Sequence, residues 1–223
     1  MTAKKPACFV FGAGRPPARP PAASPGDLIV AADGGYDYLR RYGITADALV
    51  GDFDSVKNFP GGDGEELFVR KLPKEKDQTD LLASLCLGLE RSYACFHIFG
   101  GTGGRLDHTL ANIQCLSFLV SRGARGYLYA GGTVATAFEG EVRLAARRSG
   151  TVSLFAQGGA AEGVVIRGLK YELENACLTG DFPLGVSNAF TGAPAYIKAE
   201  RGVLLLIYPG GTRELDSPSE FAE

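Results

Sequence analysis

The sequence has no strong excess of charge of either sign, because its 223 residues carry a formal net charge of -2. It also has no Lys/Arg run: Arg147 and Arg148 form an isolated pair, and Arg15 and Arg19 lie among prolines. These absences argue against a nucleic-acid-binding surface. The chain is long enough for one large domain or two small ones, and its 45% hydrophobic content is typical of a soluble globular protein.

No apolar run approaches the length needed to cross a membrane, and the stretch 7–11 is too short for the apolar region of a signal peptide. The cysteines also lack the spacing of a metal site. They are Cys8, Cys86, Cys95, Cys115 and Cys177. We expect them to be reduced core residues of a cytoplasmic protein.

The first half alternates short apolar runs with helical patterns. Strands are expected over 8–11, 28–32, 48–50, 67–69, 96–99 and 126–129, and helices over 36–42, 79–91 and 106–121. This alternation predicts an α/β domain with a mostly parallel sheet and helices on its faces. In such sheets ligands bind beyond the carboxyl ends of the strands.

From about residue 133 the pattern changes to short β-branched runs separated by glycines and polar turns, with no convincing helix. The expected strands are 134–138, 151–156, 164–167, 195–198 and 203–208. The second half is therefore predicted to be an all-β domain, a sandwich or a barrel. We place the α/β domain at 1–132 and the all-β domain at 133–223.

Two common nucleotide-binding motifs are missing. There is no Walker A sequence, so the chain is not a P-loop enzyme. Gly12-Ala13-Gly14 follows the first expected strand, but the prolines after it cannot open the helix that a dinucleotide fingerprint requires.

Two acidic clusters follow apolar elements instead. Asp52 and Asp54 come after an expected strand, and in extended chain residues two apart point to one side. Asp77 and Asp80 precede an apolar helical pattern, so they are expected on one face of its first turn. Carboxylates gathered in this way suit Mg²⁺. A turn and a helix cap are the alternative reading of each cluster alone.

A glycine-rich segment, 100–104, follows the strand expected at 96–99. Its glycines allow backbone N–H groups to approach a phosphate, and Arg105 offers a planar fork for the same anion. Asp107 and His108 can hold a metal, orient Arg105 or cap the following helix, and for His108 a structural hydrogen bond is favoured over catalysis. With the acidic clusters, this segment indicates a nucleoside triphosphate and phosphate chemistry.

The ordered set of motifs resembles the thiamine pyrophosphokinase family. The matching blocks are Asp33-Gly34-Gly35, Gly51-Asp52-Phe53-Asp54-Ser55, Lys76-Asp77-Gln78-Thr79-Asp80, Gly104-Arg105-Leu106-Asp107-His108, Gly168-Leu169-Lys170-Tyr171-Glu172-Leu173 and Gly185-Val186-Ser187-Asn188. The resemblance implies a homodimer that transfers the pyrophosphoryl group of ATP to thiamine, giving AMP and thiamine diphosphate. Neither nucleic acid nor membrane is expected as a partner.

The resemblance also implies site residues. The acidic Mg²⁺-ATP residues are Asp52, Asp54, Asp77 and Asp80, of which Asp52, Asp54 and Asp80 are expected to bind the metal. The nucleotide site is expected to contain Asp33, Gly34, Gly101, Gly104, Arg105, Asp107 and His108. Asp77 or Asp80 is the candidate base, and Arg105 is expected to take charge on the transferred group. The thiamine site is expected to contain Tyr171, Ser187, Asn188 and Phe190.

Two features depart from the family pattern. Ala189 stands where members often carry an acidic residue, and the chain has no tryptophan to stack on thiamine. Tyr171 or Phe190 can take that place through aromatic contact with the cation. Two other functions stay open at this point: a Mg²⁺-dependent nucleotide hydrolase or pyrophosphorylase, and a non-catalytic nucleotide sensor.

Overall fold

The computed structural model describes residues 5–19, 21–54, 56, 67–75 and 77–210. Its contacts divide the chain into two units, which are described separately below. The first unit comprises Met1–Cys115 with Leu128–Ala130, and the second comprises Leu116–Tyr127 with Gly131–Glu223. The expected domain boundary between 132 and 133 lies near Gly131, but the second unit also takes in 116–127, which includes the end of a helix.

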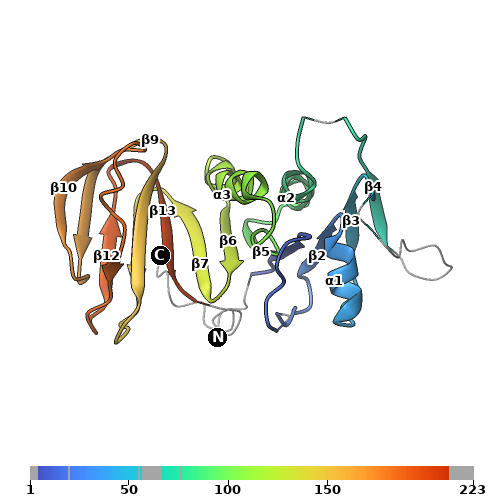
Figure 1. The fold of residues 1–223 in the computed structure, drawn as a ribbon, viewed down its shortest axis with the longest axis horizontal. Coiled ribbons are helices and arrows are strands. Elements are labelled where there is room, and N and C mark those ends of the chain that lie inside the picture. Colours follow the sequence, from blue (N-terminus) through green and yellow to red (C-terminus); the bar gives the residue numbers. More distant parts are fainter. Residues whose placement is uncertain (1–4, 20, 55, 57–66, 76, 211–223) are drawn as a thin grey trace. The chain divides into compact units, whose positions relative to one another are not determined.

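The first unit has a parallel sheet with helices (Figure 1). Its elements are β1 (Cys8–Phe11), β2 (Leu28–Ala32), α1 (Gly35–Arg41), β3 (Ala48–Gly51), β4 (Phe68–Lys71), α2 (Asp80–Glu90), β5 (Cys95–Phe99), the start of α3 (Leu106–Val120) and the end of β6 (Arg125–Ala130). The strand order is β4-β3-β2-β1-β5-β6, and each pair from β4 to β5 is parallel. The predicted α/β architecture is confirmed.

The alternation of side chains along β1 explains how helices cover both faces of this sheet. Phe11 stacks on Tyr38 of α1, with ring centroids 5.6 Å apart. Cys8 points the other way, since a Cβ on Gly88 of α2 would lie 2.9 Å from its sulfur. Residues at odd and even positions of a strand face opposite sides, so α1 and α2 cover opposite faces.

A row of aromatic rings lies under the carboxyl ends of the central strands. Phe11 and Phe99 end β1 and β5, are 1% and 0% exposed, and stack at 5.1 Å. Tyr129 of β6, which is partly buried, continues the row 4.7 Å from Phe99. Each of the two buried phenylalanines contributes about 1.5–3 kcal/mol, so the turns that follow β1 and β5 start from a well-packed base.

The second unit is built from antiparallel strands, as predicted. They are β7 (Thr133–Phe138), β8 (Glu141–Leu144), β9 (Thr151–Arg167), β10 (Leu173–Leu178), β11 (Asn188–Ala189), β12 (Ala195–Lys198) and β13 (Arg201–Pro209). The order is β7-β13-β9-β12-β8, and β10 and β11 also pair with β9.

The long strand β9 differs from the expectation of two strands over 151–156 and 164–167. Its first half pairs with β13, and its second half pairs with β10 and β12. Gly158 and Gly163 have positive φ values of 71° and 64°, so the chain bulges at these residues and continues as a strand. In the described part of the chain, no helix is long and apolar enough to cross a membrane.

Candidate active site

A pocket of about 300 Å³ lies at the carboxyl ends of β1, β2 and β5 in the first unit. Its wall includes the glycine turn Gly12–Gly14, the end of β2 at Ala32 and Asp33, and the start of α2. The glycine-rich loop and the first turns of α3 complete it. This is the place where open parallel sheets bind ligands, and where the sequence predicts the nucleotide.

Backbone hydrogen bonds hold the two glycine turns side by side. The N–H of Gly14 donates to Gly100 O at 2.7 Å, and the N–H of Arg15 donates to Thr102 O at 2.7 Å. A Cβ on Gly100 would lie only 2.2 Å from Gly12 O, so a larger residue cannot fit there without shifting the backbone. The glycines therefore permit the close approach of the two turns that line the pocket.

The predicted nucleotide glycines have different surroundings. Gly101 and Gly104 both line the pocket. A Cβ on Gly101 would lie 2.6 Å from Leu128, whereas a Cβ on Gly104 would meet open space. Gly34 is the N-cap residue of α1 and is outside the pocket lining. Gly101 thus has a packing reason to be glycine, and Gly104 leaves room for a ligand.

Three carboxylates meet beside the pocket. Asp33, Asp52 and Asp54 each offer an oxygen within 4.8 Å of the others, and they range from buried to exposed. Asp33 follows β2 and its N–H donates to Val50 O at 2.8 Å, which ties it to the neighbouring strand β3. Hard carboxylate oxygens at this spacing fit a cation such as Mg²⁺.

The way in which Asp52 and Asp54 meet differs from the prediction. Phe53 between them has φ 67°, so the segment turns through the left-handed region and is not extended. The N–H of Asp54 then donates to Oδ1 of Asp52 at 3.3 Å. The two carboxylates are brought together by this turn rather than by strand alternation. Ser55, in the same motif, lies outside the described residues.

The second acidic cluster is divided by the start of α2. The helix begins at Asp80 after the N-cap residue Thr79, whose hydroxyl accepts from Leu82 N at 3.2 Å. Asp77 lies before the cap and is exposed, so the expectation that it shares a helical face with Asp80 is wrong. Asp80 lines the pocket, and Asp77 is outside its lining. Lys76 lies outside the described residues.

Asp80 is also separate from the three-carboxylate group. Among the described residues, the acidic group close enough for shared metal binding contains Asp33 and omits Asp80. Asp33 was predicted as a nucleotide residue only. The pairing of β2 with β3 explains the difference, since Ala32 lies opposite Val50 and the two chain segments leave the sheet together.

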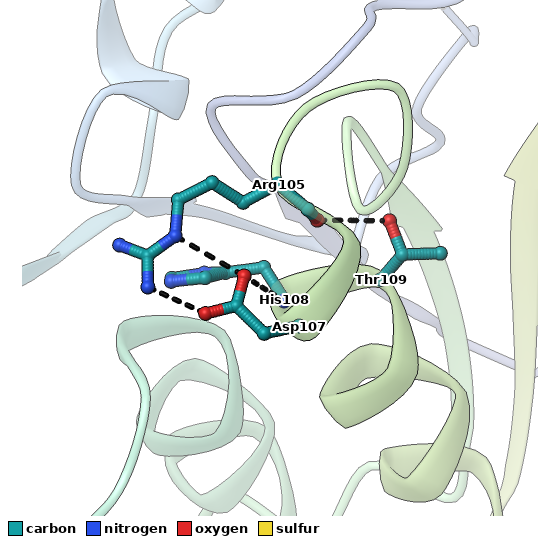
Figure 2. A network of polar contacts seen from close by, with 4 residues as sticks. All are labelled: Arg105, Asp107, His108 and Thr109. Atoms are coloured by element: carbon teal, nitrogen blue, oxygen red, sulfur yellow. Dashed lines mark hydrogen bonds and ion pairs between the residues drawn. The ribbon is translucent and has the colours of Figure 1, made fainter.

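Arg105 and Asp107 form a two-point ion pair at the start of α3 (Figure 2). Nε of Arg105 donates to Oδ1 of Asp107 at 3.1 Å, and Nη2 donates to Oδ2 at 2.5 Å. This hydrogen bond lowers the pKa of Asp107 to about 2 and raises that of Arg105. The pair orients the guanidinium, in agreement with one of the roles considered for Asp107.

His108 lies next to this ion pair in Figure 2, and it lines the pocket with Arg105. Its backbone N–H donates to Oδ1 of Asp107 at 3.0 Å, which is a helix-start contact. Thr109, on the next position, donates through its hydroxyl to Arg105 O at 3.2 Å. Asp107 therefore serves both the helix start and the arginine.

Asn112 was not predicted, although it lines the pocket. Its side chain is 6% exposed, and Nδ2 donates to Gly101 O at 2.8 Å. The bond anchors the glycine-rich loop to α3 from behind. The sequence did offer a signal for this residue, because Asn112 is polar among the apolar positions of α3 and lies one turn after His108.

Asn188 in the second unit fixes the loop that carries Tyr171. Its Oδ1 accepts from Tyr171 N and Ala189 N, both at 2.9 Å, and its Nδ2 donates to Tyr171 O at 2.6 Å. Asn188 is 4% exposed. Most of its hydrogen-bonding capacity is therefore used on backbone groups.

The two aromatic candidates for thiamine differ in access. Tyr171 is 57% exposed, with the Lys170 ammonium 5.2 Å from its ring centroid. Phe190 is 5% exposed, and Arg147 lies 5.7 Å from its ring centroid. Ser187 adopts φ 62°, and its N–H donates to the Ser153 hydroxyl at 3.2 Å. Tyr171 is the more accessible ring for stacking.

Comparison with known proteins identifies both halves of the chain. Residues 22–128 match the family model of the thiamin pyrophosphokinase catalytic domain, and residues 141–204 match that of its vitamin B1 binding domain. The thiamine pyrophosphokinase of Bacillus subtilis (strain 168) is 40% identical over 91 residues, which are 40% of this chain. The match spans 42% of that relative's length, less than half.

Solved structures extend the similarity to nearly the whole chain. The thiamine pyrophosphokinase of Bacillus subtilis superposes with a TM-score of 0.79 at 25% identity, covering 92% of this chain and 99% of that one. The yeast thiamin pyrophosphokinase has the same fold, with a TM-score of 0.69 at 16% identity over 96% of this chain and 89% of that one. With both of its characteristic domains present, the chain belongs to the thiamin pyrophosphokinase family.

Proposed function

We propose that this protein is a thiamine diphosphokinase, which transfers the pyrophosphoryl group of ATP to thiamine. The observation that carries the proposal is the pocket at the strand ends of the catalytic domain, where Asp80, Arg105 and the glycine-rich loop face one space beside three carboxylates. Such a site suits a nucleoside triphosphate, because the carboxylates attract a divalent cation and the loop and arginine attract phosphates.

In the proposed reaction the hydroxyl oxygen of thiamine attacks the β-phosphorus of ATP in line with the bond to the α-phosphate oxygen. That bond breaks, AMP leaves with the electron pair, and the alcohol proton goes to a base. Asp80 is favoured over Asp77 as this base because Asp80 lines the pocket. Positioning and charge neutralisation supply most of the rate enhancement in reactions of this type.

We further propose that Asp33, Asp52 and Asp54 hold Mg²⁺, with Asp80 facing the nucleotide across the pocket. Bound there, Mg²⁺ would neutralise charge on the phosphate oxygens. Arg105, oriented by Asp107, is placed to take negative charge on the transferred group. Two hydrogen bonds support this arrangement: Asp33 N donates to Val50 O, and Asp54 N donates to Oδ1 of Asp52.

On the thiamine side, we propose that Tyr171 contacts the cationic ring and that Ser187 supplies a polar contact. Asn188 holds Tyr171 in place through its backbone bonds. Phe190 then supports the loop from the interior, since its ring is buried. We also propose a cytoplasmic homodimer. The free state of all five cysteines supports a reducing compartment, and sedimentation at twice the 23.5 kDa chain mass tests the dimer.

Product analysis tests the function directly. Incubation with Mg²⁺, ATP and thiamine is expected to yield AMP and thiamine diphosphate in equal amounts, with no ATP loss when thiamine is omitted. ATP consumption without thiamine would identify a hydrolase. Nucleotide binding without any turnover would identify a sensor, and ADP with thiamine monophosphate would point to a different transfer.

A further inference from the structure

Arg15 lies against the glycine-rich loop from the opposite turn. Its backbone N–H donates to Thr102 O at 2.7 Å. A Cβ on Gly103 would lie 2.6 Å from the Cβ of Arg15, so the base of the arginine side chain rests on the loop. Its neighbours on both sides, Gly14 in sequence and Thr102 in space, line the pocket.

Arg15 and Arg105 differ in their ion pairing. Arg105 is held at two points by Asp107, so an arriving phosphate meets a guanidinium that is already paired. Among the described residues, no carboxylate is paired with Arg15, and its side chain is exposed. Arg15 is therefore a cation at the pocket edge that is available to a new anion without breaking an ion pair within the described structure.

We propose that Arg15 is a second phosphate-binding residue, which contacts the outer phosphates of the nucleotide. The proposal rests on the proposed function in taking the ligand to be a nucleoside triphosphate. Arg15 and Arg105 approach the glycine-rich loop from separate elements, the turn after β1 and the start of α3. Two guanidinium groups around one loop suit the several charged oxygens of a polyphosphate, because each fork binds two oxygens.

The backbone contacts explain why the arginine stands at this position. The bond from Arg15 N to Thr102 O fixes its Cα beside the loop, so only the side chain has to become ordered when the ligand binds. Two charge-assisted hydrogen bonds to phosphate oxygens outweigh the rotamer entropy lost by one arginine side chain, so a net gain in affinity follows when both form.

Binding of AMP, ADP, ATP and inorganic triphosphate to Arg15→Ala tests this role. Titration calorimetry is expected to show a loss of about tenfold for ATP and triphosphate, a smaller loss for ADP and an unchanged affinity for AMP. Arg15→Lys is expected to be intermediate, because it keeps the charge and loses the fork. Arg19→Ala is the matched control: Arg19 is also exposed, lies in the same proline-containing segment and has none of the loop contacts described for Arg15.

The pattern across ligands separates a phosphate contact from a structural role. An equal loss for all four ligands, or a lower melting temperature without ligand, would overturn the proposal in favour of loop support. Wild-type affinity for ATP and triphosphate in Arg15→Ala would also overturn it, as would a wild-type protein that binds neither. These binding measurements need no thiamine, so they test Arg15 independently of the proposed function. If product analysis finds no thiamine diphosphate but the graded loss of affinity appears, the proposed function is refuted and the role of Arg15 stands.

Discussion

Substitution of Asp54 by asparagine tests whether the three carboxylates form a cation site. The three groups approach within 4.8 Å of one another, and at an effective dielectric constant of about 20 each pair of charges repels by about 3.5 kcal/mol. Asp54 is exposed, so water and salt screen most of this repulsion, and about 1 kcal/mol is expected to remain. Asparagine keeps the shape and removes one charge.

We therefore expect Asp54→Asn to stabilise the metal-free protein by about 1 kcal/mol, a rise of roughly 2–4 °C in melting temperature for a chain of this size. Wild-type protein should gain about 2.7 kcal/mol at a Mg²⁺ concentration one hundred times the dissociation constant. The variant should gain much less stability from Mg²⁺. Its turnover should fall about 100-fold or more, because a displaced metal ion loses several kcal/mol of transition-state charge stabilisation.

Thermal unfolding in EDTA and across a Mg²⁺ titration measures both effects. Glu139→Gln is the control, because it removes one exposed carboxylate that belongs to the second unit and is not a member of the three-carboxylate group. The reasoning fails if Asp54→Asn is no more stable than wild type in EDTA and shows the same Mg²⁺ shift. A variant with a higher melting temperature in EDTA and a smaller shift with Mg²⁺ would establish that the three carboxylates destabilise the metal-free protein and bind the cation.

Two further predictions concern positioning and pH. Asn112→Leu should leave Gly101 O without its donor and destabilise the protein by about 1–3 kcal/mol while weakening ATP binding; unchanged ATP affinity by titration would remove Asn112 from the site. The hydrogen bond from Arg70 lowers the pKa of Glu90 below its ordinary 4.5, so its contribution is present above that value and is lost as pH falls through the lower folded pKa. Because both side chains are partly exposed, Glu90→Gln should cost only about 0.5 kcal/mol at neutral pH. Urea unfolding should show the two proteins converging in acid, and a constant difference down to pH 2 would contradict this assignment.

The sequence predicts the first unit well because its strands are short, apolar and bounded by glycine or aspartate. The pocket position followed from the same pattern, since β1, β2 and β5 all end in polar or glycine-rich turns. The strands of the second unit were harder to predict from the sequence. Gly158 and Gly163 lie between the expected strands 151–156 and 164–167, where a turn was predicted, but in β9 they form bulges, because the sequence pattern of a bulge resembles that of a turn.

The grouping of Asp33 with Asp52 and Asp54 needed information that periodicity lacks. These residues follow different strands, and only the pairing of β2 with β3 brings them together. Asn112 was missed for a related reason, because its role depends on a contact with Gly101, eleven positions earlier. Local patterns locate the ends of elements, whereas contacts between those ends depend on strand order.

Backbone conformation at the proposed sites indicates what holds the functional groups. Five non-glycine residues in the described chain have positive φ. Asp33 is one of the three carboxylates, and Phe53 lies between the other two, Asp52 and Asp54. Ser187 of the proposed thiamine site also has positive φ. Each costs about 1–3 kcal/mol unless the surroundings compensate, so such residues persist where neighbouring structure fixes them. At Asp33 the bonds to Val50 O and from Tyr36 N supply that support. The carboxylates are therefore positioned by the backbone, which allows them to stay close together despite their mutual repulsion.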